Sequence, residues 1–240
     1  MADRLAIAFA VAAISVLVLG GVLRAVARRT TAPWVRQVGG LTLFVVAPVG
    51  LLVAASVPTR AVAVVAGALV LGALGLLRTW VRVPPWLVGL VVLAVAIGVT
   101  TTGVRFPFGG VPAVDAVWTV VWLSVVTAVV ANSGNADGQY PALTAASAVG
   151  ILGVAGFARQ SAAAVLAAAL VGALLAFLAY NWRPASLYVG RGGAWFVAFL
   201  VAAGATWAHP SIGKPGSLVV SLMLVGVALL DGVVVMLSRL

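Results

Sequence analysis

The chain has 240 residues, 64% of them hydrophobic and 8% charged, with a mean hydropathy of +1.25, and no water-soluble domain of this length carries such a surface. Zero cysteine and a single histidine exclude disulfides, thiolate metal sites and a histidine cluster. The net charge of +10 comes from arginines scattered between apolar runs, without the basic tracts of a nucleic-acid-binding protein, and favours anionic lipid headgroups as partners.

Nine apolar runs follow one another along the chain, each close to the length of about 20 residues that a spanning helix needs. The connections between them are short, so neighbouring helices are predicted to pack antiparallel. The sequence therefore predicts an all-α, polytopic membrane helix bundle of about nine transmembrane helices, which forms one transmembrane domain over residues 1–240. The runs cover residues 5–23, 41–57, 61–77, 86–102, 113–131, 142–158, 161–180, 194–208 and 217–236.

The placement of basic residues predicts the orientation of this bundle, because short loops rich in Lys and Arg stay in the cytoplasm. Loops on one side of the membrane carry nine basic residues, and loops on the other side carry five. We therefore expect the N-terminus outside and the C-terminus in the cytoplasm. The nine are Arg24, Arg28, Arg29, Arg36, Arg78, Arg82, Arg183, Arg191 and Arg239, and the five are Arg4, Arg60, Arg105, Arg159 and Lys214.

The four most polar breaks between the runs all fall on the predicted cytoplasmic side, at residues 28–40, 78–85, 132–141 and 181–193. The last of them, NWRPASLYVGRGGA from Asn181 to Ala194, is a polar, glycine-rich loop with Arg191 at its centre. A functional site on the cytoplasmic face, centred on this loop, is predicted.

Four segments carry a family resemblance. Residues 30–44, TTAPWVRQVGGLTLF, form a basic, proline-containing loop that ends in a Gly-Gly pair, and residues 132–138 hold Asn-x-x-Asn followed by Asp-Gly. The block from residue 181 holds Asn-x-x-Pro-Ala and then Gly-x-x-Gly, and the last run carries an aspartate. In this order on one membrane face, the segments resemble the polyprenyl-phosphate N-acetylhexosamine-1-phosphate transferases, which include the phospho-N-acetylmuramoyl-pentapeptide transferases. The matching residues are Asn132, Asn135, Asp137, Gly138, Asn181, Pro184, Ala185, Gly190, Gly193 and Asp231.

The resemblance implies an enzyme that joins a nucleotide-activated sugar phosphate to a lipid phosphate, releases UMP and uses Mg²⁺ held by aspartates. The chain departs from this pattern where carboxylates are expected. Arg78 and Thr79 stand at the family's Asp-Asp pair, and Arg191 stands at the metal-liganding Asp of Gly-Asp-x-Gly-Ser. A second Asp-Gly is missing, and the chain reaches Leu240 before the family's His-rich cytoplasmic loop and last helix. A guanidinium repels Mg²⁺ as well as failing to ligate it, so ordinary metal-dependent catalysis is not expected.

The sequence thus predicts a catalytically degenerate, C-terminally shortened transferase-like membrane protein, without a cofactor, in the plasma membrane of a prokaryote. It would bind polyprenyl phosphate or a membrane-protein partner during cell-envelope glycan assembly, and the resemblance implies a homodimer or a hetero-oligomer. One alternative is an active UDP-sugar transferase whose Mg²⁺ is held by Asp137 and Asp231. The second alternative is an unrelated transporter-like bundle.

The charged candidate residues have two interpretations each. Arg78 and Arg191 can hold a lipid phosphate or pyrophosphate in place of the metal, because guanidinium forks match phosphate oxygens, or they can only set the topology. Asp231 lies inside the last predicted helix, where a carboxylate is costly, so we expect an ion pair between Asp231 and Arg78 or Arg191. A protonated or snorkelling Asp231 is the alternative.

The uncharged candidates and Asp137 lie in the two central loops. Asn132, Asn135 and Asn181 can donate hydrogen bonds to a ligand, or they can cap helix ends. Asp137 can contact a nucleotide or a partner, or it can be a solvated carboxylate near a helix N-terminus.

Overall fold

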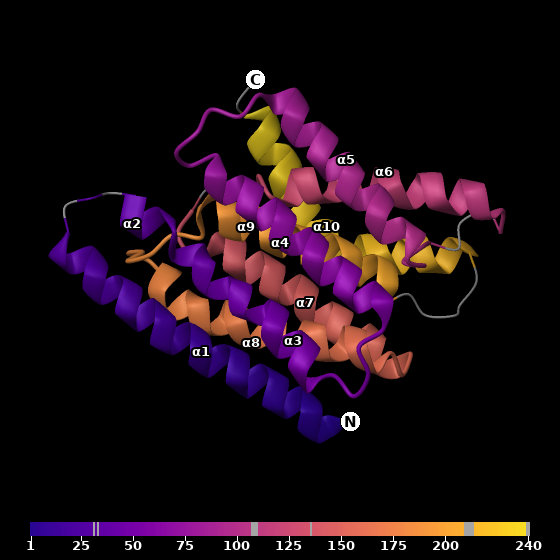
Figure 1. Ribbon diagram of the computed structural model, residues 1–240, viewed down its shortest axis with the longest axis horizontal. Coiled ribbons are helices and arrows are strands. Elements are labelled where there is room, and N and C mark those ends of the chain that lie inside the picture. Colours follow the sequence, from indigo (N-terminus) through magenta and orange to yellow (C-terminus); the bar gives the residue numbers. More distant parts are fainter. Residues whose placement is uncertain (31, 33, 107–109, 135, 209–213, 239–240) are drawn as a thin grey trace.

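The computed structural model describes residues 1–240 except 31, 33, 107–109, 135, 209–213 and 239–240, and all regular elements of the described part are helices (Figure 1). They are α1 (Ala2–Arg29), α2 (Trp34–Gln37), the 3₁₀ helix η1 (Gly39–Val45), α3 (Val46–Val53), α4 (Thr59–Leu77), α5 (Pro85–Thr101), α6 (Pro112–Val130), α7 (Gln139–Phe157), α8 (Ser161–Asn181), α9 (Gly190–Trp207) and α10 (Lys214–Leu237). The prediction of an all-α bundle is confirmed.

Each of the nine predicted runs is helical, although the second is made of η1 followed by α3. Seven helical segments of the described chain are long and apolar enough to cross a membrane, with α2, η1 and α3 taken together as one of them. The runs outside the seven are α5, a shorter apolar helix of 17 residues, and α9.

Helices α8 and α9 form the centre of the bundle, because most of their residues are buried. Helix α8 packs against α1, α7 and α3, while α9 packs against α4, α6, α7 and η1. Small residues allow these contacts: a Cβ added to Gly172 of α8 would collide with the backbone of Phe9 in α1. Figure 1 shows α1 along one edge of the bundle and α5 and α6 along the opposite edge.

The outward faces of the peripheral helices are apolar, as a lipid-facing surface requires. Large exposed side chains on α1 include Ile14 and Val18, and those on α10 include Met223 and Leu230. Because successive helices run in opposite directions, the ends of α1, α4, α6, α8 and α10 meet the starts of α5, α7 and α9 at one end of the bundle, which we call the polar end.

Candidate functional site at the polar end

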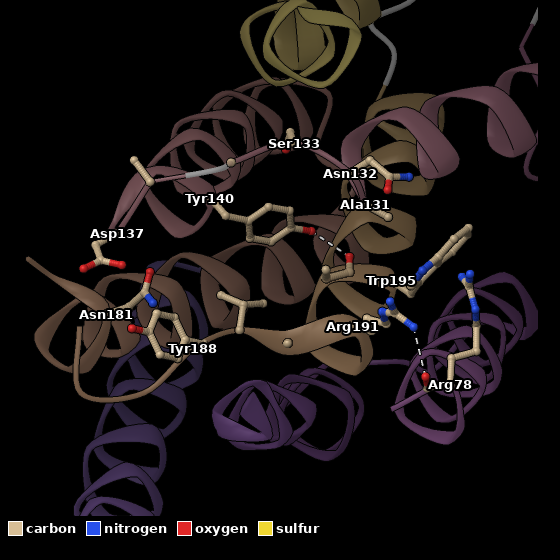
Figure 2. A pocket seen from close by; sticks show the side chains of 15 residues that line it. Arg78, Ala131, Asn132, Ser133, Asp137, Tyr140, Asn181, Tyr188, Arg191 and Trp195 are labelled. Atoms are coloured by element: carbon tan, nitrogen blue, oxygen red, sulfur yellow. Dashed lines mark hydrogen bonds between the residues drawn. The ribbon is translucent and has the colours of Figure 1, made fainter. Parts of the chain in front are cut away.

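A cavity of about 480 Å³ opens at the polar end, and three of the predicted polar breaks line it (Figure 2). Arg78 follows α4, Asn132 and Asp137 lie between α6 and α7, and Asn181 and Arg191 flank the segment between α8 and α9. The fourth break supplies Gln37 to a smaller adjoining hollow. The structure therefore brings these predicted site residues to one place, whereas Asn135 lies outside the described residues.

The buried side chain of Asn181 ties two loops together. Its Oδ1 atom accepts a hydrogen bond from the amide of Gly138 at 3.1 Å, and its Nδ2 atom donates to the carbonyl of Leu187 at 2.8 Å. Asp137 adds a second link, since its Oδ2 atom accepts from the amide of Ala185 at 3.0 Å. Asn181 and Asp137 thus hold residues 137–138 against residues 185–187 and fix one wall of the cavity.

Arg191 lies in the first turn of α9, not at the centre of a loop as the sequence predicts. The reason is Gly190, which has φ +62° and lies so close to the carbonyl of Gln37 that a Cβ would collide with it. The left-handed conformation is available to glycine without steric cost, so the chain can turn there and begin the helix at once. Helix α9 consequently starts at the cavity wall.

Glycines also fix the position of this helix start. A Cβ on Gly193 would lie 2.7 Å from the Cα of Gly40, and a Cβ on Gly75 would lie 2.5 Å from the carbonyl oxygen of Arg191. The first turn of α9 therefore packs backbone to backbone against η1 on one side and α4 on the other. This packing explains the Gly-Gly pair of the first polar break and places Arg191 next to Arg78.

Arg78 and Arg191 form a pair of like charges in the cavity. The Nη1 atom of Arg191 donates to the carbonyl oxygen of Arg78 at 3.0 Å, while Arg191 is exposed and Arg78 is partly buried. Burial and the neighbouring Arg191 guanidinium both lower the pKa of Arg78. Arginine keeps its charge in proteins, so the two guanidinium groups concentrate positive charge on this side of the cavity.

Asp231 does not form the expected ion pair. Its carboxylate accepts hydrogen bonds from the amide of Gly134 at 2.6 Å and from Nε2 of Gln139 at 2.6 Å, and in the described part of the chain no salt bridge joins it to Arg78 or Arg191. Asp231 lies six residues before the end of α10, so it reaches the loop at the polar end, where neutral donors are available.

The model of glycosyl transferase family 4 matches residues 41–209, which is more than half of the chain and includes all the described residues of the cavity. The chain belongs to glycosyl transferase family 4.

Two curated proteins are similar to this family 4 chain. A Streptomyces coelicolor protein assigned as a glycosyltransferase, SCO3672, is 33% identical over 175 residues, which cover 72% of the chain and 41% of that protein. A Bacillus subtilis protein assigned as an undecaprenyl-phosphate N-acetylglucosaminyl 1-phosphate transferase is 26% identical over 222 residues, covering 82% of the chain and 61% of that protein. The chain thus spans roughly half the length of these relatives. It is a multi-pass membrane protein of this family.

The carboxylates of this family 4 chain do not fit the Mg²⁺ site that the resemblance implies. Helix directions place Asp3 and Asp115 at the end of the bundle opposite the cavity. At the polar end, both oxygens of Asp231 accept hydrogen bonds from protein donors, and Asp137 is the one carboxylate in the described cavity lining. No group of three His, Cys, Asp or Glu side chains occurs among the described residues, and two guanidinium groups share the cavity with Asp137.

Three aromatic side chains of the cavity were missed by the sequence analysis. Tyr140 is buried and donates from its hydroxyl to the carbonyl of Ala194 at 2.6 Å, and Tyr188 and Trp195 also line the cavity. A signal was available for Trp195, since it follows Arg191 by four residues and so shares its helix face. Tyr188 had no such signal, because its position depends on the hydrogen bond from its amide to the carbonyl of Arg36.

Proposed function

We propose that this chain is a catalytically degenerate member of glycosyl transferase family 4 that binds a polyprenyl-phosphate-type lipid at the polar end and does not transfer sugar phosphate. The observation that carries the proposal is the composition of the cavity. The segments that the family uses for phosphate chemistry converge there, but their charged side chains in the cavity are two arginines, Arg78 and Arg191, and one carboxylate, Asp137. A lipid phosphate is held well by such a surface, whereas Mg²⁺ is repelled by it.

The location of the cavity suits a ligand that is lipid at one end and anionic at the other. The cavity lies at the end of a bundle whose outward faces are apolar, so a polyprenyl chain can stay in the bilayer while its phosphate enters the cavity. The excess of arginines at this end supports a cytoplasmic orientation. The protein would then be an accessory or scaffold subunit of cell-envelope glycan assembly in a prokaryotic plasma membrane, as a homodimer or with a membrane-protein partner.

Native mass spectrometry of the purified protein tests the binding part of this proposal. Polyprenyl phosphate should remain bound in the gas phase, and the neutral polyprenol of the same chain length should not. In a parallel assay with UDP-N-acetylhexosamine, polyprenyl phosphate and Mg²⁺, no UMP should be released. Equal retention of the phosphate and the alcohol would contradict lipid-phosphate binding.

An active transferase is the second candidate function. The exposure of the Asp137 carboxylate in the cavity favours it. The name of the Bacillus subtilis relative points the same way. Mg²⁺-dependent UMP release that is lost in the Asp137→Asn variant would establish this function and overturn the proposed one. Family membership excludes the third reading, an unrelated transporter-like bundle.

A further inference from the structure

Two hollows adjoin each other at the polar end, and the arginine pair lies between them. The larger hollow of about 480 Å³ extends toward Asn132, Asp137 and Tyr188, whereas the smaller one of about 230 Å³ extends toward Gln37 and Thr79. Both are lined by Arg78, Gly190 and Arg191. A ligand in either hollow therefore meets the same two guanidinium groups.

The arginine pair retains most of its hydrogen-bonding capacity. Each guanidinium carries five N–H donors in a planar fork, and the hydrogen bond within the pair uses Nη1 of Arg191 and a backbone oxygen of Arg78. Within the described part of the chain, neither side chain forms a salt bridge to a carboxylate. Burial and the neighbouring charge of Arg191 both lower the pKa of Arg78, and an anion between the two groups would relieve their mutual repulsion.

Each of the two hollows has room for at least one phosphoryl group. A phosphoryl group occupies the volume of three or four water molecules, about 100 Å³ at about 30 Å³ each. The smaller hollow can thus hold one phosphoryl group with its solvent, and the larger hollow can hold a second one together with the group attached to it. A monophosphate would fill only one side of the pair.

We infer that Arg78 and Arg191 form a metal-independent clamp for a diphosphate group, with one phosphoryl group in each hollow. The clamp takes the place of a divalent cation by supplying two fixed positive charges and several directional donors. This inference rests on the proposed function for its lipid ligand, but it makes a separate statement about the phosphate chemistry of the site, and that statement can be tested without any lipid.

Calorimetric titration of the full chain in detergent with inorganic pyrophosphate and with orthophosphate, both in EDTA, tests the clamp. Pyrophosphate should bind at least tenfold more tightly than orthophosphate, and replacing EDTA by Mg²⁺ should not strengthen binding. Equal affinities for the two anions, or binding that requires Mg²⁺, would overturn the inference.

Single-residue variants identify the side chains that bind pyrophosphate. Arg78→Gln and Arg191→Gln should each weaken pyrophosphate binding at least tenfold, whereas Arg82→Gln removes the same charge from the same end of the bundle outside both hollows and should change it less than twofold. If either glutamine variant fails to fold, the lysine variant at that position keeps the positive charge but lacks the planar guanidinium fork. Its affinity for pyrophosphate should still be several-fold lower than that of the unmodified chain. Equal affinities in the Arg78, Arg191 and Arg82 variants would refute the assignment.

A further binding experiment with lipid ligands distinguishes this inference from the proposed function. Polyprenyl phosphate and polyprenyl diphosphate are offered to the protein in nanodiscs, with EDTA present. Pyrophosphate binding without any lipid-phosphate binding would leave the clamp intact and refute the proposed function. Lipid-phosphate binding that is unchanged in Arg78→Gln and Arg191→Gln would keep the proposed function and refute the clamp.

Discussion

At position 191 a guanidinium takes the place where the resemblance leads us to expect a metal-liganding carboxylate. The first turn of α9 presents this group to the cavity, and the carbonyl oxygen of Arg78 holds its Nη1 atom at 3.0 Å. A guanidinium and a carboxylate at this position attract ligands of opposite charge. A single substitution at this residue can therefore test the change in chemistry.

Arg191→Asp should convert a metal-independent anion site into a metal-dependent one. The variant removes a positive charge and adds a second carboxylate to the cavity that contains Asp137, so phosphate ligands would be repelled unless Mg²⁺ is present. In calorimetry we expect pyrophosphate binding in EDTA to fall at least tenfold and to recover partly with Mg²⁺. Arg82→Asp is the control with the same charge change, and an equal Mg²⁺ effect in both variants would contradict this prediction.

Asp231 stabilises the loop between α6 and α7, because its two oxygens accept hydrogen bonds from the amide of Gly134 and the side chain of Gln139. Asp231→Asn leaves one of these donors facing an amide NH₂ group. We expect the free energy of unfolding to fall by about 1–3 kcal/mol, as when a partly buried charged acceptor is lost. Thermal unfolding in detergent measures this. Ser238→Ala, a change of an exposed residue just beyond the same helix end, should have little effect on the thermal midpoint. An unchanged midpoint for Asp231→Asn would contradict the stabilising role of Asp231.

At the scale of elements, the position of α9 depends on glycines from three different helices. Gly40 of η1 and Gly193 of α9 lie so close that neither position has room for a Cβ. In contrast, a Cβ on Gly98 of α5 would meet nothing within 4 Å. The two kinds of glycine offer a matched comparison within one bundle.

Gly40→Ala should destabilise the bundle and weaken the site, whereas Gly98→Ala should not. The added methyl group at residue 40 collides with the carbonyl of Val189 and the Cα of Gly193, an overpacking that costs about 1–3 kcal/mol and displaces the start of α9. At residue 98 alanine improves helix propensity by up to about 1 kcal/mol. Thermal midpoints and pyrophosphate affinities measure both effects, and similar behaviour of the two variants would contradict the close-packing argument.

The nine apolar runs could be predicted to be helical because each has nearly membrane-spanning length, a property of the run itself, whereas the four-residue α2 lies outside these runs. The convergence of Arg78, Asp137 and Arg191 could also be predicted, since antiparallel helices with short connections bring alternate loops to one end. The partners of Asp231 could not, because they depend on how α10 packs beside the loop that precedes α7. The start of α9 at Gly190 depends in the same way on contacts with η1 and α4, which are distant in the sequence.

At the scale of the whole molecule, charge is distributed unevenly between the two ends of the bundle. Arginines at the polar end include the two of the clamp and the exposed Arg28, Arg36, Arg82 and Arg183. The carboxylates Asp3 and Asp115 lie at the other end. Short loops with such an excess of arginine are retained in the cytoplasm during insertion, and this orientation decides whether the cavity faces cytoplasmic or external ligands.

Single-cysteine labelling can determine the orientation directly, because the chain contains no cysteine of its own. Ser56→Cys places a thiol in the connection between α3 and α4, opposite the cavity, and Ser238→Cys places one beyond α10 at the polar end; both serines are exposed. In intact cells a membrane-impermeant maleimide should label residue 56 and not residue 238, while permeabilised cells should show both. Labelling of residue 238 alone in intact cells would show that the orientation is the opposite of the expected one. The arginine clamp would then lie outside the cytoplasm, where nucleotide-activated sugars would not reach it.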